Sequence, residues 1–277
     1  MPEQRRFKLA ITAALGASPS APILVRGSLA GAFQQASILG YRGVELQLRD
    51  PQEIDPEEMT DLCQRYDLAI PALGSGMVAV EDHLTFSDPS EHTRRMAMKR
   101  IQEFIHLAQA LNSGVIIALI FGNIGKDQSQ RSGRWKAALG CLRDCCALAS
   151  QYGVPLYLEP LNRYESDCLN TVEEGKAVIQ EVGSPALKLL VDSYHMNIEE
   201  KGIEDSLYAA RDVLGHVHLA DSNREAPGRG HIDFQSILAM LRRIEYHGFL
   251  SFEILPRPDT RQALQQAIEF INNLAKL

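Results

Sequence analysis

Four polar side chains interrupt apolar segments in the second half of the chain, and their types suit metal chemistry. Each lies near the carboxyl end of a run that is otherwise typical of a buried strand: Glu159, Asp192, His218 and Glu253. An unpaired charge inside a sheet costs several kcal/mol or shifts its pKa until the group is neutral. A shared divalent cation would compensate all four groups together. Three carboxylates and one imidazole suit Mn²⁺, Co²⁺ or Mg²⁺, and the lack of thiolates in this set argues against structural zinc.

The strands and helices that position these side chains can be predicted from the spacing of apolar residues along the chain. Short apolar runs alternate with longer amphipathic stretches, and the predicted strands are residues 8–14, 43–48, 69–74, 115–120, 155–160, 187–192, 216–221 and 249–254. Several of the helical patterns between them begin with Ser or Thr and end with Gly. Eight strand and helix pairs, with no Pro/Ser-rich linker, predict a parallel sheet closed into a single (β/α)₈ TIM barrel. We expect residues 1–277 to form one catalytic domain.

In this fold, the position of a residue at the end of a strand predicts whether it belongs to the active site. Active sites of TIM barrels lie at the C-terminal face, on the loops that follow the strands. The four polar side chains end the fifth to eighth predicted strands. We therefore expect them to converge on one quadrant of the barrel mouth despite their wide separation in sequence.

Composition restricts the expected partners and compartment. The formal net charge is −7 and the basic residues are scattered, so nucleic acid is not an expected partner. The apolar run after Arg5 and Arg6 is too short to span a bilayer and fits a first strand better than a signal peptide, so no membrane association is expected. The five cysteines include three on one predicted helix, which favours reduced thiols in a cytoplasmic protein over a disulfide framework.

Several segments carry a resemblance to a known family. The segments are LEPLNRYES, VDSYHMNIEE, HVHLADSNREAPGRGH and FEIL. In order, spacing and strand context they resemble the D-tagatose 3-epimerase-like ketose epimerases, which belong to the xylose isomerase-like TIM barrels. GYRGVELQLRDP and the GSG turn further resemble the branch that contains 5-keto-L-gluconate epimerase.

The resemblance implies a specific chemistry. One divalent ion, most often Mn²⁺ with Co²⁺ or Mg²⁺ as alternatives, would be held by Glu159, Asp192, His218 and Glu253. Glu159 and Glu253 would also act as acid and base on opposite faces of the carbon next to a carbonyl, through a cis-enediolate. Three side chains would contact substrate oxygens: Glu165, His195 and Arg224. The implied activity is a metal-dependent 3-epimerase of a ketose or keto-sugar acid, in a homo-oligomer such as a dimer or tetramer.

Other activities of this superfamily remain open at this point. An aldose–ketose isomerase of the hydroxypyruvate isomerase type would use the same proton chemistry on adjacent carbons. A DNA repair barrel of the endonuclease IV type needs further ligands after the third and fourth strands, where this chain reads GSGM and FGNI. A sugar-binding barrel without turnover is the third alternative.

Basic residues on the predicted loops bear on the choice of substrate. Arg49, Lys126 and Arg229 are candidates to bind a carboxylate or phosphate of the substrate, which would suit a keto-sugar acid.

Residues near the predicted site carry separate expectations. Arg163 is expected to pair with Glu165 in a structural role. His216 is expected to point away from His218 and to serve in packing. Glu45 has two open interpretations, a position at the barrel mouth or a bond to a neighbouring strand's loop.

Overall fold

The barrel wall is a closed parallel sheet. The computed structural model describes residues 7–274. The strands of the wall are β1 (Lys8–Ala14), β3 (Gly43–Gln47), β4 (Ala72–Gly74), β5 (Gly114–Ile117), β6 (Leu156–Leu158), β7 (Leu187–Asp192), β8 (Leu214–Leu219) and β9 (Phe249–Phe252). Each strand pairs with the next in parallel, and β1 also pairs with β9, which closes the ring. The predicted (β/α)₈ barrel is confirmed. A two-residue strand, β2 (Val25–Arg26), pairs with the end of β1 outside the ring.

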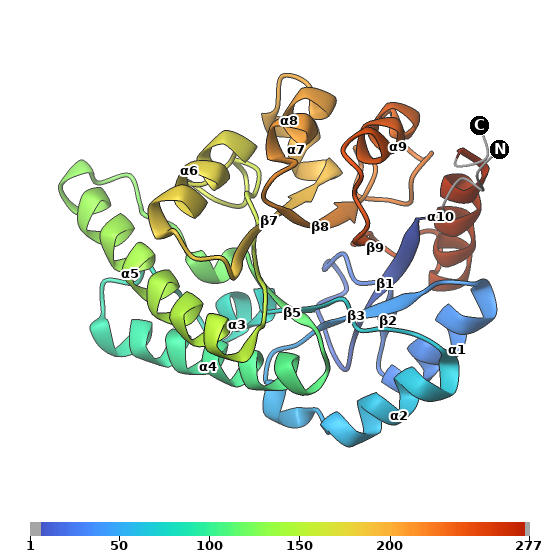
Figure 1. Cartoon of the computed structure of the whole chain (residues 1–277), viewed down its shortest axis with the longest axis horizontal. Helices are drawn as coiled ribbons and strands as arrows, with labels where there is room; N and C mark the ends of the chain where they lie inside the picture. The colour runs from blue at the N-terminus through green and yellow to red at the C-terminus, as the bar shows by residue number, and fades with distance from the viewer. Residues whose placement is uncertain (1–6, 275–277) are drawn as a thin grey trace.

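The helices surround the strands in chain order, as Figure 1 shows. They are α1 (Leu29–Leu39), α2 (Pro56–Tyr66), α4 (Glu91–Ala110), α5 (Gln128–Tyr152), α6 (Val172–Val182), α8 (Ile203–Ala210), α9 (Phe234–Arg243) and α10 (Thr260–Leu274). Short helices occupy connections on the way: α3 (Gly76–Glu81), α7 (Ser193–Glu199), η1 (Pro51–Glu53) and η2 (Leu119–Phe121). The short elements were not predicted, because their apolar patterns are too brief to show a helical period.

The helix ends follow local signals in the sequence. Thr171 and Glu174 form a reciprocal capping box at the start of α6, and Gly183 ends that helix in the left-handed conformation. Helix α5 begins at Gln128, because the side chain of Asp127 accepts a hydrogen bond from the backbone N–H of Ser129. Residues 275–277, which end the helical pattern after the last predicted strand, and the two arginines at positions 5 and 6 lie outside the described residues.

The barrel interior combines an aliphatic wall with a polar centre. Tyr157 of β6 crosses the interior, where a Cβ on Gly114 would lie 2.2 Å from its ring and one on Gly215 would lie 2.8 Å from it. Glycine at both positions therefore leaves room for the ring, which stacks on His216 with centroids 5.3 Å apart. Around this layer, aliphatic side chains of the strands and helices form one continuous core. The sheet thus fixes its polar residues inside a rigid apolar frame.

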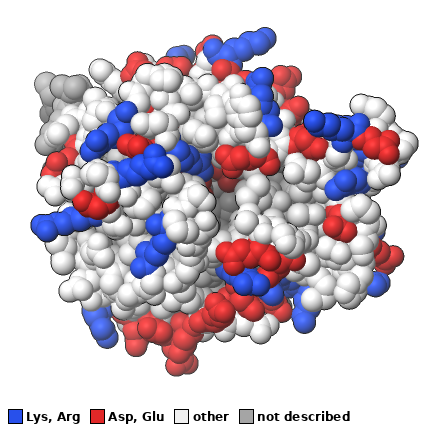
Figure 2. Space-filling view, turned by 180° about the vertical axis from the view of Figure 1, so that it is seen from behind, with Lys and Arg blue, Asp and Glu red and all other residues white. Residues whose placement is uncertain are grey.

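The surface carries charges of both signs. On the face shown in Figure 2, acidic and basic side chains are interspersed, and acidic groups gather along the lower edge. Within residues 7–274, every helix is too short or too polar to cross a bilayer.

Candidate active site

The ends of four consecutive strands bring the predicted ligands together. Glu159 directly follows β6, Asp192 ends β7, His218 lies in β8 and Glu253 directly follows β9. His218 is in register with Asp192 on the neighbouring strand, so the two side chains start from the same level of the barrel. The predicted convergence on one quadrant is present in the structure. One potential ligand atom from each of the four side chains lies within 4.8 Å of those of the other three.

The geometry of this quartet fits a divalent cation. His218 Nδ1 lies 3.6 Å from Glu159 Oε1 and 3.7 Å from Glu253 Oε2. Both Glu159 Oε1 and His218 Nδ1 are buried and make no hydrogen bond. Buried polar atoms without a partner are costly, and here two of them point toward one another. Oxygen donors with one imidazole nitrogen are a donor set that Mn²⁺, Co²⁺ or Mg²⁺ accepts.

The two glutamates of the quartet differ in their affinity for protons. Burial raises the pKa of Glu159 to about 7. Burial would also raise the pKa of Glu253, but the charges of Arg224 and His218 outweigh it and lower the pKa of this carboxyl. At neutral pH, Glu253 is therefore ionised whereas Glu159 exchanges readily between its two forms. Carboxyl groups whose environments separate their pKa values are typical of an acid and base pair.

Arg224 bridges two members of the quartet. Its guanidinium donates to Asp192 Oδ2 at 2.7 Å and to Glu253 Oε2, and it stacks over the ring of Tyr194 at 4.6 Å. Burial would lower the pKa of Arg224, but the charges of Asp192 and Glu253 outweigh this effect and raise the pKa above its usual value, so the group is a permanent cation. Its backbone adopts φ of 62° in the loop after β8, and its side chain lines the cavity at the barrel mouth. One guanidinium opposes three carboxylates, so negative charge remains in excess without a cation.

His195 offers a neutral donor to the site. The backbone N–H of Asn162 donates to His195 Nδ1 at 3.2 Å, which places the ring proton on Nε2. His195 Nε2 lies 3.4 Å from Arg224 Nη1, on the side of the quartet. Burial, reinforced by the charge of Arg224, holds the pKa of His195 well below its usual value, so the ring is neutral at pH 7. It can therefore donate one hydrogen bond to a ligand oxygen.

A cavity of about 320 Å³ opens above the quartet. One side is lined by the predicted site residues Glu159, Glu165, His195, Arg224 and Glu253. The β1–β2 loop and helix α3 form the other side, which is largely apolar and includes Met77 and Val80. The three predicted substrate contacts thus share one cavity with two of the predicted ligands. The volume is within the range of small-molecule sites.

The candidate residues for binding an acidic substrate lie elsewhere. Arg49 pairs with Asp82 at 2.6 Å, and Arg229 donates to Gln266 at 2.6 Å. Neither these arginines nor Lys126 lines the cavity.

Replacement of Arg49 by Ala should consequently change KM for a sugar acid and for the matching neutral ketose by the same small factor, below about threefold. The measurement is steady-state kinetics with both substrates. A rise in KM confined to the acid would contradict this placement and support direct binding.

Two expectations about neighbouring residues are wrong in part. Arg163 does have a structural ion pair, but its partner is Glu199 at 2.8 Å and not Glu165. His216 does not point away from His218, because residues two apart on a strand share a face. Their ring centroids are 5.2 Å apart.

Glu45 fits neither of its two interpretations. Its carboxylate is fully buried inside the barrel, where His216 Nε2 lies 2.8 Å from Oε2 and His218 Nε2 lies 3.1 Å from Oε1. Asn162 was also missed: its side-chain amide donates to Glu165 at 2.8 Å. The polar run NRYE pointed to this loop, but only the fold shows which member faces His195.

Comparison with known proteins supports the same class. The family model of the xylose isomerase-like TIM barrel matches residues 33–274. The chain therefore belongs to the xylose isomerase-like TIM barrel family.

Relatives within that family are sugar epimerases. The chain is 35% identical to an L-ribulose 3-epimerase of Methylomonas sp. strain DH-1, over 82% of this chain and 77% of the relative. It is 33% identical to a 3-dehydro-D-guloside 4-epimerase of Escherichia coli K12, over 65% and 72%. The crystal structure of a Methylomonas D-allulose 3-epimerase in complex with D-allulose has a TM-score of 0.79 at 27% identity, with 97% of both chains covered.

Proposed function

We propose that the chain is a divalent-metal-dependent epimerase that inverts the carbon next to the carbonyl of a ketose or keto-sugar acid. Its family and relatives make it an isomerase-class enzyme, and within that class a sugar epimerase. The observation that carries the finer proposal is the convergence of four ligand side chains, two with unpartnered buried atoms, beneath a cavity of sugar size. We also propose that residues 1–277 form one catalytic domain.

The proposed cofactor is a single divalent cation. Glu159, Asp192, His218 and Glu253 would hold it, and we propose Mn²⁺, with Co²⁺ or Mg²⁺ as alternatives. When bound, such an ion stabilises the negative charge that develops on the substrate oxygen as the neighbouring carbon loses its proton.

The proposed proton transfers use the two glutamates. Inversion requires that a proton leave one face of the carbon and that another arrive on the opposite face. We assign acceptance of the proton to Glu253 and delivery of a proton to the other face to Glu159, because both side chains line the cavity. In the reverse reaction the two roles exchange.

The remaining cavity residues would orient the sugar. Arg224 and the Nε2 proton of His195 can donate to the oxygens at the carbonyl end. The carboxylate of Glu165, whose side chain is 40% exposed, can accept from a hydroxyl further out. These contacts hold the reacting carbon between the glutamates, and orientation of that kind contributes to rate through reduced entropy loss.

The names of the relatives agree with this reaction. A ketose 3-epimerase and a 3-dehydro-glycoside 4-epimerase both act at a carbon next to a carbonyl. The described cavity lining contains no lysine, and its one arginine, Arg224, is already bound by Asp192 and Glu253. This favours a neutral ketose over a sugar acid, and the likeness to the 5-keto-L-gluconate epimerase branch stays a prediction.

Assembly and location are proposed from the family and from the cysteines. Dimers or tetramers are common in the family, and we propose a homo-oligomer. All five cysteines carry free thiols, most of them buried, which supports a reducing compartment such as the cytoplasm.

Solvent exchange tests the proposed function. The Mn²⁺-loaded protein is incubated in D₂O with candidate ketoses, keto-sugar acids and hydroxypyruvate, and products are followed by NMR. We expect deuterium at the carbon next to the carbonyl together with the epimeric ketose. An aldose product would instead indicate the aldose–ketose isomerase. Binding without exchange for every candidate would overturn the proposal in favour of a sugar-binding barrel.

A further inference from the structure

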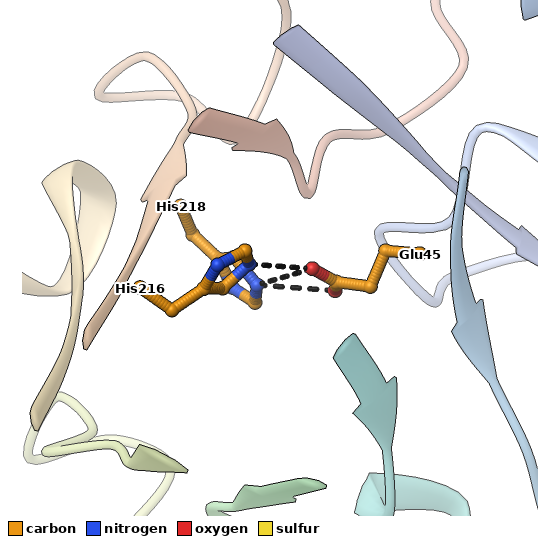
Figure 3. Close-up of side chains that lie close together, drawn as sticks. All are labelled: Glu45, His216 and His218. Carbon is orange, nitrogen blue, oxygen red and sulfur yellow. Dashed lines mark hydrogen bonds and ion pairs between the residues drawn. The ribbon is translucent and has the colours of Figure 1, made fainter. Parts of the chain in front are cut away.

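A second polar cluster lies at the centre of the barrel, beneath the proposed metal site. It consists of Glu45 of β3 and of His216 and His218 of β8, and Figure 3 shows the carboxylate facing both rings across the barrel. All three side chains are nearly or fully buried. Burial of a carboxylate costs free energy of desolvation unless partner groups compensate it. We therefore asked which function Glu45 serves at this position across the barrel from the two histidines.

The contacts within this cluster are of hydrogen-bond length. His216 Nε2 lies 2.8 Å from Glu45 Oε2, and His218 Nε2 lies 3.1 Å from Glu45 Oε1. The atoms that face one another here all have hydrogen-bond partners, whereas Glu159 Oε1 and His218 Nδ1 of the quartet have none. We therefore assign the cation to the quartet and hydrogen bonds to the contacts of Glu45 with the two rings.

The two nitrogen atoms of His218 face different partners. Nε2 points to Glu45, whereas Nδ1 faces Glu159 and Glu253 and has no hydrogen-bond partner. Since Glu45 accepts the proton on Nε2, Nδ1 is the nitrogen directed toward the other ligands, and its lone pair becomes available when a cation takes the place of a proton there. Without that acceptor, the proton could reside on either nitrogen and the ring could rotate about χ2.

Glu45 is itself held by groups other than His218. The amide of Gln47 donates to Glu45 Oε1 at 2.9 Å, and His216 donates to the other oxygen. His216 is fixed in turn by stacking on Tyr157 and by Ser251 Oγ at 3.1 Å. The carboxylate is thereby presented to His218 in one orientation.

We propose that Glu45 is a positioning residue for the metal centre, which orients His218 so that Nδ1 binds the cation. The inference rests on the metal site of the proposed function. A carboxylate on the outer nitrogen of a histidine ligand fixes the tautomer and ring orientation, and its loss typically lowers metal affinity by about 10- to 100-fold. Glu45 touches neither the cation site nor the cavity, so its effect passes entirely through His218.

Metal binding without substrate provides the test. The affinity of the chelator-treated full-length protein for Mn²⁺ is measured by titration calorimetry for the wild type and for Glu45→Gln. Glutamine keeps the shape but offers one acceptor oxygen where the carboxylate has two. We expect the Kd for Mn²⁺ to rise by about 10- to 100-fold. The visible absorption spectrum of the Co²⁺ form should also change, because the geometry of the ligand field changes.

A matched control separates positioning from general loosening of the core. Tyr41→Phe removes a buried hydrogen bond to the backbone carbonyl of Leu264, which lies outside the Glu45, His216 and His218 cluster. It should lower Tm without changing the Mn²⁺ affinity by more than about twofold. In a His218→Gln background, Glu45→Gln should have no further effect on affinity, because the residue through which it acts is absent. If Glu45→Gln does not fold, Glu45→Asp keeps the charge, withdraws the carboxylate by one methylene and should weaken Mn²⁺ binding in the same direction.

Each outcome decides the proposal. Unchanged affinity in the Glu45 variants, an equal loss in Tyr41→Phe, or a full effect of Glu45→Gln in the His218→Gln background overturns the role of Glu45. A wild-type protein that binds no Mn²⁺ overturns the metal site and with it this inference. If the wild type binds Mn²⁺ and the Glu45 variants bind it equally well, the metal site stands and only the positioning role of Glu45 is wrong.

Discussion

Removal of the divalent cation with EDTA should lower turnover by on the order of 10³-fold, and added Mn²⁺ should restore it. The carbon next to a carbonyl is a weak acid, and the neutral His195 and the engaged Arg224 cannot match a dication in stabilising the charge that develops on the oxygen. The measurement is the rate of epimer formation before chelation, after dialysis against EDTA and after re-addition of metal.

The chelated protein itself provides the control. Binding of a ligand to the folded state stabilises it by about 2.7 kcal/mol at a concentration 100 times Kd, so Mn²⁺ should raise Tm of a protein that is still folded without it. Full activity in protein shown by elemental analysis to be metal-free would contradict the proposed mechanism.

Glu253→Gln should reduce kcat by about 10²- to 10⁴-fold, the usual contribution of a positioned acid or base. Glutamine has nearly the same volume but cannot accept a proton, and it also weakens one ligand of the quartet. Glu159→Gln should cause a loss of the same order, because each face of the carbon needs its own group. All assays contain saturating Mn²⁺, so that a lower kcat reports on proton transfer and not on weaker metal binding.

The matched control for both variants is Glu225→Gln. Glu225 lies in the loop next to Arg224, outside the cavity lining, and pairs with Arg257 at 3.6 Å. Its loss should leave kcat within about twofold. If Glu225→Gln lowers kcat as much as Glu253→Gln does, removal of charge from this region, and not proton transfer, would explain the effect.

Local pattern was enough to predict the architecture of this chain. Each strand of the barrel wall overlaps a predicted apolar run, because a strand buried on both faces reads as a short continuous apolar segment. The cap residues Thr171 and Gly183 mark helix ends through hydrogen bonds and backbone conformations that involve only neighbouring residues. The quartet was predictable because the barrel places every strand exit on one face.

Pairing between side chains was not predictable in the same way. Arg163 binds Glu199 at the end of α7, and Arg49 binds Asp82, which directly follows α3. Both partners lie more than thirty residues away in sequence. The position of the acidic partner in space depends on how the loops pack, and periodicity carries no information about that.

The sequence by itself determined the barrel, the strand exits and the types of the four ligand side chains, since these depend on the local alternation of apolar and polar residues. Only the tertiary structure decided that Glu45 of β3 reaches across to His216 and His218 of β8. Closure of the sheet brings those strands to opposite walls of one narrow interior. The distance between opposite walls is set by the closure of the whole ring, and no single segment encodes it.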